Sequence, residues 1–296
     1  MNPCEPAPDT DKKKARERRG FVCISRSASL NSPQTQITIK QIDTSINMPT
    51  GKVLIILSDA HSFPLHKSDG TTVDQPSGFF LMELAKPLAK ILDAGYEVTF
   101  ASPKGQTPQP DPLSTSLLAF AGNYLEKQRE TALIDKMKTE NNLNTPRPFS
   151  SLSDEELATY DGVFIPGGHA PLSDLGADKE LGRILTHFHE TQKPTASLCH
   201  GPYALLSTKV GPQGTFVYKG YKITSWSDTE EKFMETMLGG EITKVESSLR
   251  DEGAEMVEGL AQSALGRITV DRELISAANP MGADGLGDKF VEMLKK

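Results

Sequence analysis

One cysteine, Cys199, lies at a kind of position where a thiol is often reactive. Cys199 ends a predicted buried strand over 194–199 and precedes a predicted helix over 200–207. Sites in open α/β sheets lie at the carboxyl ends of strands, and a helix N-terminus lowers the pKa of a thiol. Gly201 and Pro202 suit a close backbone approach and a first helical turn. We therefore predict a nucleophilic Cys199 on a tight turn, with a buried, inert thiol as the alternative.

A second glycine turn is expected beside the first. Gly167, Gly168 and His169 also follow a buried apolar strand, so this turn is predicted at the same edge of the sheet. Its backbone N–H groups would be placed to stabilise an oxyanion formed next to Cys199. A simple tight turn without a chemical role is an equally good interpretation of these three residues.

Alternating strands and helices must position both turns. The pattern predicts a three-layer α/β/α sandwich with a mostly parallel sheet and right-handed crossovers. A long insertion over 103–148, with a helix over 116–138, is of the kind that covers a site. The other predicted elements are strands over 52–57 and 97–102, helices over 77–94, 177–192, 256–265 and 284–294, and hairpins over 216–226 and 267–277.

The chain divides in composition near residue 50. Residues 1–50 are rich in Pro, Ser, Thr, Lys and Arg, and they are predicted to form a disordered tail. A targeting segment is the alternative, although the acidic residues of the tail disfavour it. Residues 51–296 are predicted to form the folded domain.

Charge and composition exclude several classes of protein. The 296 residues carry a net charge of −7, which disfavours a nucleic-acid partner because such a partner requires a basic face. No apolar run approaches the roughly 20 residues that span a bilayer. Three cysteines, two of them in the tail, suggest no disulfide framework. We expect a cytoplasmic protein, with the nucleus as the alternative.

Two motifs together resemble a known family. Ile165-Pro-Gly-Gly-His169 and, about thirty residues later, Ser197-Leu-Cys-His-Gly-Pro202 are similar to motifs of the ThiJ/PfpI superfamily, which has the class I glutamine amidotransferase-like, flavodoxin-like fold. The resemblance runs from Lys52 to the C-terminus. It is strongest to the heat-shock branch, which contains glyoxalase III (D-lactate dehydratase) and holding chaperones. The segments shared with that branch are 77–83, 223–228 and Asn279-Pro280.

The resemblance implies a set of site residues. It makes Cys199 the nucleophile, His200 its neighbouring histidine and Glu83 a carboxyl group in contact with the sulfur. Asp228 falls where the family places the acid of a Cys-His-acid triad, and Glu231 is the alternative acid. Asp228 could equally be the N-cap of a helix. A surface-facing Glu83 is less favoured, because its neighbours are apolar.

The resemblance also implies an activity. Members of this branch convert methylglyoxal-type 2-oxoaldehydes to 2-hydroxy acids through the cysteine, without a cofactor, and are commonly homodimers. The alternatives are a stress-response holding chaperone that binds unfolded client proteins, a cysteine redox sensor and, third, a cysteine peptidase. Amidotransferase activity is disfavoured because no histidine follows His200, and no zinc-motif spacing links His61, His66 or His169, so no metal is expected.

Overall fold

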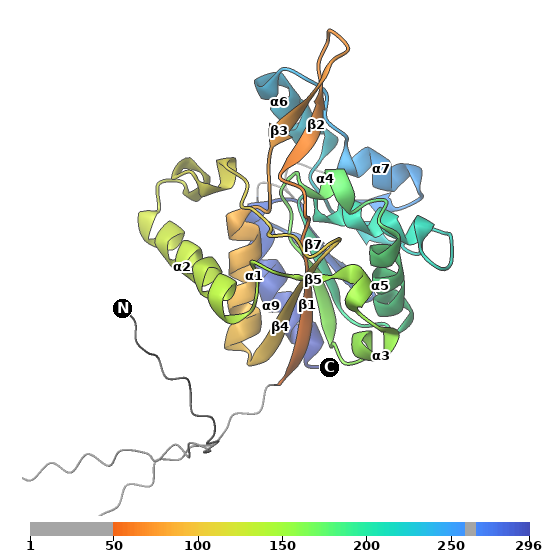
Figure 1. Ribbon diagram of the computed structural model, residues 1–296. Helices are drawn as coiled ribbons and strands as arrows, with labels where there is room; N and C mark the ends of the chain where they lie inside the picture. Colours follow the sequence, from red (N-terminus) through yellow and green to blue (C-terminus); the bar gives the residue numbers. More distant parts are fainter. Residues whose placement is uncertain (1–49, 258–264) are drawn as a thin grey trace, which may run out of the picture. The chain divides into compact units, whose positions relative to one another are not determined.

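A seven-stranded sheet organises the part of the chain that the structure describes, which is residues 50–257 and 265–296 of a computed structural model (Figure 1). The predicted tail lies outside these residues, apart from Thr50. Most of the predicted helix over 256–265 also lies outside them, and its first residue, Met256, belongs to a strand instead. The strand order is β10-β11-β7-β6-β1-β4-β5, and every neighbouring pair is parallel except β10 with β11. The strands are β1 (Gly51–Ile56), β4 (Tyr96–Ser102), β5 (Arg147–Pro148), β6 (Gly162–Ile165), β7 (Thr195–Leu198), β10 (Ile268–Asp271) and β11 (Leu274–Ala277).

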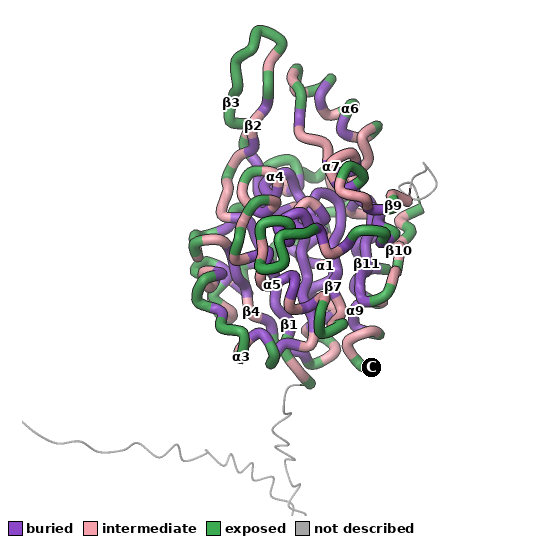
Figure 2. Tube along the Cα trace, turned by 90° about the vertical axis from the view of Figure 1, so that its right-hand side faces the viewer, coloured by how far each residue is buried: buried purple, intermediate pink, exposed green. Residues whose placement is uncertain are grey.

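Helices cover both faces of this sheet, so the predicted three-layer α/β architecture is confirmed. Val53 and Ile55 of β1 belong to the apolar core under α1 (Leu81–Asp93) and α9 (Ala283–Leu294). Their neighbours in β1 point the other way, into the core under α5 (Lys179–Glu190) and the 3₁₀ helix η4 (Gly201–Val210). Burial on both faces explains why β1 is a continuous apolar run (Figure 2).

Shorter elements complete the described part. The insertion holds η1 (Leu113–Thr115), η2 (Leu118–Phe120) and α2 (Tyr124–Glu140), and α2 packs against α1. The predicted helix over 116–138 therefore begins later than expected. The remaining helices are η3 (Phe149–Ser151), α3 (Asp154–Leu157), α4 (Pro171–Asp174), α6 (Asp228–Leu238), α7 (Val245–Asp251) and η5 (Pro280–Gly282). None of the described helices is both long enough and apolar enough to cross a membrane.

The start of α1 differs from the prediction in a way that matters for the site. The helix begins at Leu81 rather than Ser77, because the preceding residues bind other segments. The Phe79 N–H donates to the Gln109 carbonyl of the insertion, and the Phe80 N–H donates to the Gly167 carbonyl of the glycine turn. The first turn of α1 is thereby held against the glycine turn.

Of the two predicted hairpins, one is wrong and one is confirmed. Within 216–226 the strand β8 (Lys222–Ile223) pairs in parallel with β9 (Glu255–Met256), and the Gly220 N–H donates to the Gly253 carbonyl. This segment packs against the core because the side chains of Tyr218 and Tyr221 are fully buried. The second hairpin forms as predicted from β10 and β11.

A further hairpin was not predicted. Strands β2 (Ser62–His66) and β3 (Thr72–Pro76) pair antiparallel and extend beyond the carboxyl edge of the sheet, next to α6 (Figure 1). The buried side of β2 is apolar, because Phe63 and Leu65 pack with Ile242. The residues of β3 are mostly polar and exposed, so they leave too little apolar alternation to predict a strand.

Candidate active site

Cys199 lies on a strained turn between β7 and η4. Its φ is 58°, in the left-handed region that residues other than glycine rarely adopt. Two backbone hydrogen bonds hold it there, from the Cys199 N–H to the Ala277 carbonyl (3.0 Å) and from the Trp226 N–H to the Cys199 carbonyl (2.9 Å). A Cβ on Gly201 would lie 2.7 Å from the Ile165 carbonyl oxygen, so the turn needs glycine there. The predicted tight turn is present.

The electrostatic expectation for this thiol is wrong. Burial first, and then the nearby Glu83 carboxyl group, raise the pKa of Cys199 well above its usual value. The backbone N–H groups of Gly168 and His200 point at the sulfur and lower the pKa, but they do not outweigh the other effects. The resting sulfur is therefore a thiol rather than a thiolate, and a base must remove its proton when it reacts.

Glu83 lies in the first turn of α1, fully buried, and faces the same sulfur. Neither of its oxygens makes a hydrogen bond of ordinary geometry within the described residues. Burial raises the pKa of Glu83 from its usual 4.5 to about 8, although weak hydrogen bonding to Cys199 and to the Gly167 backbone lowers it. Glu83 is thus a carboxylic acid at neutral pH and a proton donor beside the thiol.

The glycine turn brings its backbone to Cys199. Gly168 has a φ of 98° and directs its N–H toward the sulfur, as does the N–H of His200. Two N–H groups that converge beside a nucleophile can stabilise an oxyanion. Gly167 is equally constrained, because a Cβ there would lie 2.4 Å from a Glu83 oxygen and 2.6 Å from the Cys199 Cβ.

We expect Gly167→Ala to lower the free energy of unfolding by about 1–3 kcal/mol, because the added methyl group meets buried atoms that have no room to move. The same displacement should separate Glu83 from Cys199 and reduce activity. Gly285→Ala is the matched control, because Gly285 is exposed on α9 and a Cβ there makes only an ordinary contact. Urea unfolding checks both variants, and equal stabilities would contradict the close packing.

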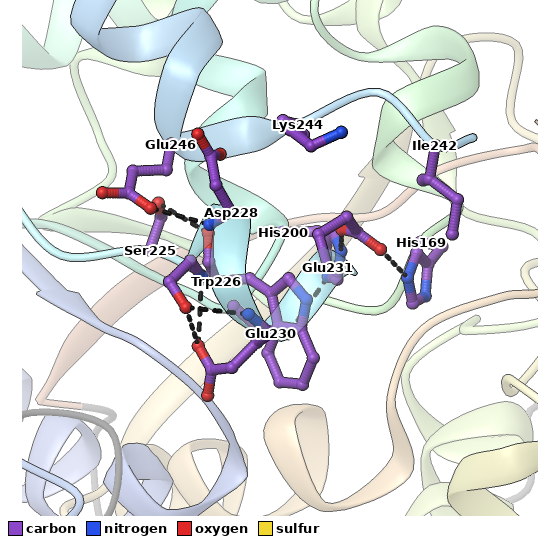
Figure 3. Close-up of polar contacts among 12 residues, drawn as sticks. His169, His200, Ser225, Trp226, Asp228, Glu230, Glu231, Ile242, Lys244 and Glu246 are labelled. Atoms are coloured by element: carbon purple, nitrogen blue, oxygen red, sulfur yellow. Dashed lines mark hydrogen bonds and ion pairs between the residues drawn. The ribbon is translucent and has the colours of Figure 1, made fainter. Parts of the chain in front are cut away.

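Three further side chains form a hydrogen-bonded relay. The Nδ1 atom of His200 lies 3.2 Å from the Cys199 sulfur. Its Nε2–H donates to Glu231 Oε2 at 2.7 Å (Figure 3). The Nε2–H of His169 donates to the other Glu231 oxygen at 3.2 Å. The rings of the two histidines lie 3.9 Å apart. Glu231 therefore joins the end of β7 to the glycine turn after β6.

The charge states in this relay follow from burial and bonding. Burial would raise the pKa of Glu231, but the hydrogen bonds from His169 and His200 outweigh it and lower that pKa to about 2. Burial, and then His169, lower the pKa of His200 to about 4. His200 is thus a neutral imidazole whose Nε2 proton is held by an anionic Glu231. Its Nδ1 lone pair faces the thiol and can accept the thiol proton.

The structure does not bring Asp228 to His200. Asp228 is the first residue of α6, and its carboxylate accepts hydrogen bonds from the Ser247 backbone N–H (3.2 Å) and the Ser247 hydroxyl. Ser227, rather than Asp228, is the N-cap, in a complete capping box with Glu230. The alternative acid of the sequence analysis, Glu231, occupies the position beside His200, one turn further into the helix (Figure 3).

The two acids give a matched pair of variants. Glu231→Gln should lower kcat/KM about tenfold to a hundredfold, because an amide orients His200 and stabilises its charged form less well. Asp228→Asn should leave kcat/KM within about twofold and lower the unfolding free energy by about 0.3–1 kcal/mol, since a negative charge at a helix N-terminus is lost. Steady-state kinetics and thermal unfolding distinguish them, and the reverse order of effects would make Asp228 the acid.

A pocket of about 280 Å³ opens over Cys199, His200 and Glu83. Several of its lining residues were not among the predicted site residues: Phe80, Leu113, Leu118, Trp226 and Met234. The Trp226 ring stacks on His200 with centroids 5.5 Å apart. Its place within the shared segment 223–228 was the one sequence signal for it. The leucines of the insertion carried none, although the insertion was predicted to cover a site.

The same relay is a possible metal site within the described residues. One ligand atom from each of His169, His200 and Glu231 lies within 4.8 Å of the others. Two imidazoles and a carboxylate are a common donor set for zinc and similar cations. The His61 and His66 side chains lie elsewhere, hydrogen-bonded to the Thr107 carbonyl and the Thr72 hydroxyl respectively. A cation bound to these residues would compete for the Glu231 lone pairs that accept the hydrogen bond from His200.

Comparison with known proteins identifies the family to which this chain belongs. The sheet order and the cysteine turn define a flavodoxin-like α/β protein with a buried cysteine at the carboxyl edge of its sheet. A model of the family described as ThiJ/PfpI family-like matches residues 75–232, more than half of the chain, so the chain belongs to the ThiJ/PfpI family. The resemblance found in the sequence is confirmed.

Individual relatives fall in the expected branch. The chain is 26% identical over 221 residues to the protein/nucleic acid deglycase HchA of Staphylococcus aureus, covering 72% of this chain and 71% of that protein. Its fold matches glyoxalase III of Candida albicans, with a TM-score of 0.64, 24% identity and coverage of 82% and 97%. It also matches Rapid Encystment Protein of Francisella tularensis, with a TM-score of 0.63, 21% identity and coverage of 82% and 99%.

Proposed function

We propose that this protein is a glutathione-independent glyoxalase (D-lactate dehydratase) that converts methylglyoxal-type 2-oxoaldehydes to 2-hydroxy acids. One observation carries the proposal: a buried thiol, a neutral imidazole 3.2 Å away and a carboxylic acid all line one small pocket. Addition to a carbonyl needs a nucleophile, a base and an acid within reach of each other.

The first step joins substrate and enzyme. The Cys199 sulfur attacks the aldehyde carbon while its proton passes to His200 Nδ1. The aldehyde oxygen becomes the hydroxyl of a hemithioacetal, with a proton from Glu83. The N–H groups of Gly168 and His200 stabilise the negative charge that develops on this oxygen.

The second step moves hydrogen within the adduct. The Glu83 carboxylate left by the first step removes the proton from the former aldehyde carbon, while the protonated His200 gives its proton to the ketone oxygen, and an enediol forms. Glu83 then returns its proton to the carbon that was the ketone, and the hydroxyl on the former aldehyde carbon loses its proton to His200. The aldehyde carbon is oxidised to a thioester, and the ketone carbon is reduced to an alcohol. Water hydrolyses the thioester, which releases the 2-hydroxy acid and restores the thiol.

The direct test is product formation without glutathione. Purified protein incubated with methylglyoxal should form D-lactate, measured with a lactate dehydrogenase specific for that enantiomer, while heat-denatured protein should form none above background. A native protein that forms no lactate of either hand would overturn the proposal. Racemic lactate would contradict stereospecific return of the proton.

A deglycase is the second candidate, because the curated relatives bear that name. The same thiol, base and acid would act on an aldehyde still attached to an amino or guanidino group. A preformed adduct of methylglyoxal and N-acetylarginine separates the two activities. Lactate formed faster than the adduct releases methylglyoxal spontaneously would favour the deglycase.

A holding chaperone has its own support in the exposed apolar side chains of the insertion, Leu117, Leu118, Tyr124 and Leu125. Suppression of client aggregation that persists in Cys199→Ser would favour this role. A redox sensor is less well supported, because Cys199 is 4% exposed and its raised pKa keeps the sulfur in the less oxidisable thiol form.

A further inference from the structure

The pocket over Cys199 is lined by two chemically different groups of residues. One group is reactive and consists of the thiol, His200 and Glu83. The other forms an apolar wall from the insertion, the N-cap of α1, α6 and η5: Phe80, Leu113, Leu118, Ala119, Met234 and Pro280. Two polar side chains at this wall are already occupied by the protein. Asp111 accepts hydrogen bonds from the Ser77 hydroxyl (2.7 Å) and the Leu113 N–H (2.8 Å), and the Ser116 hydroxyl donates to the Leu113 carbonyl (2.8 Å).

The wall offers nothing for a negatively charged substrate. Among the described residues that line the pocket none is lysine or arginine, and the carboxyl groups there belong to Glu83 and Asp111. A substrate carboxylate or phosphate on this wall would lose its hydration without gaining a partner. Substrates with an uncharged group beyond the carbonyls meet no such penalty.

The volume points to a group larger than methyl. A pocket of about 280 Å³ has room for roughly nine water-sized groups at about 30 Å³ each. Methylglyoxal has only five non-hydrogen atoms, so much of the apolar wall would stay in contact with water. Phenylglyoxal has ten, and its ring would cover the leucines and the methionine.

Resting on the proposed function, we propose that the preferred substrates are uncharged 2-oxoaldehydes that carry an aromatic or branched apolar group, and that Leu118 helps to select them. Phenylglyoxal represents this class. The chemistry balances as for methylglyoxal: phenylglyoxal and one water give mandelate, through the same thioester on Cys199.

Three substrates and two matched variants test the proposal. In the wild-type protein, kcat/KM for phenylglyoxal should be at least about tenfold higher than kcat/KM for methylglyoxal. The value for the anion glyoxylate should be lower than that for methylglyoxal. Leu118→Asp should reduce kcat/KM for phenylglyoxal about tenfold more than it reduces kcat/KM for methylglyoxal. Leu125→Asp is the control, because Leu125 is similarly exposed in the same insertion but does not line the pocket.

Failure of the preference can be told from failure of the proposed function. Turnover of methylglyoxal at a kcat/KM equal to or above that for phenylglyoxal, or a Leu118→Asp effect equal for both, overturns the preference alone. If no aldehyde is turned over, the proposed function fails and binding decides the preference. Trp226 is the one tryptophan of the chain and lines the pocket, so its fluorescence reports binding.

Neutral product analogues provide that binding test. Mandelamide should bind about tenfold more tightly than lactamide, and Leu118→Asp should remove the difference. Equal affinities for the two amides would overturn the apolar preference. Leu113→Asp is a second variant of the same wall, in case Leu118→Asp changes the fold.

Discussion

Replacing Cys199 with serine is expected to lower kcat/KM for methylglyoxal by at least about a thousandfold. The pocket, Glu83 and the relay remain, but a hydroxyl is a far weaker nucleophile than a thiol and is harder to deprotonate. Serine has nearly the same shape as cysteine, so it should tolerate the 58° φ no worse, and the melting temperature should stay within a few degrees.

The chain allows a clean control for this variant. The other cysteines are Cys4 and Cys23, so the double variant Cys4→Ser/Cys23→Ser leaves Cys199 as the sole thiol. The double variant should keep full activity in the D-lactate assay. Equal rates for Cys199→Ser and the wild-type protein would remove the thioester from the mechanism. Loss of activity in the double variant would point to a different sulfur.

Glu83→Gln is expected to lower kcat/KM about a hundredfold, within the usual range for removal of a general acid. Glutamine fills the same buried space and keeps the polarity, but it neither gives a proton to the aldehyde oxygen nor takes one from carbon. Steady-state kinetics with methylglyoxal measure the loss. Activity within twofold of wild type would leave the proton transfers to His200 alone.

The same variant makes a prediction about stability. Because the pKa of Glu83 is raised from 4.5 to about 8 in the folded protein, its contribution to stability is full below about pH 4.5 and is lost as the pH rises through about 8. Glutamine does not titrate, so Glu83→Gln should lose less unfolding free energy than wild type between pH 6 and pH 9. Glu130 also has a raised pKa, about 7, but it is present in both proteins and cancels in the comparison. Urea unfolding at the two pH values measures the difference, and parallel losses would mean that Glu83 is ionised in the fold.

Features encoded in short stretches of sequence could be predicted. The buried run of β1, the glycine turn and the cysteine turn each depend on local residue types, and all three appear where they were expected. The hairpin over 216–226 was wrong because Lys219-Gly220 resembles a turn. The sequence alone does not reveal that Tyr218 and Tyr221 would both be buried against other segments.

The acid of the relay shows the limit of such reasoning within the site. Asp228 and Glu231 are three residues apart in the first turn of one helix, so both could face His200 on spacing alone. The choice depends on α7, because its Ser247 binds the Asp228 carboxylate and leaves Glu231 to the histidines. The raised pKa of the thiol was beyond prediction for a related reason: it depends on how deeply Glu83 and Cys199 are buried together.

The left-handed backbone at Cys199 brings selection for stability into conflict with selection for chemistry. An L side chain in this conformation costs about 1–2 kcal/mol relative to glycine, so the residue at position 199 that is best for folding is not the residue that supplies a sulfur. A population selected only for thermal robustness would drift toward glycine here and lose the thiol. Retention of cysteine at such a position in descendants of this chain would therefore be a record of selection for chemistry rather than for stability.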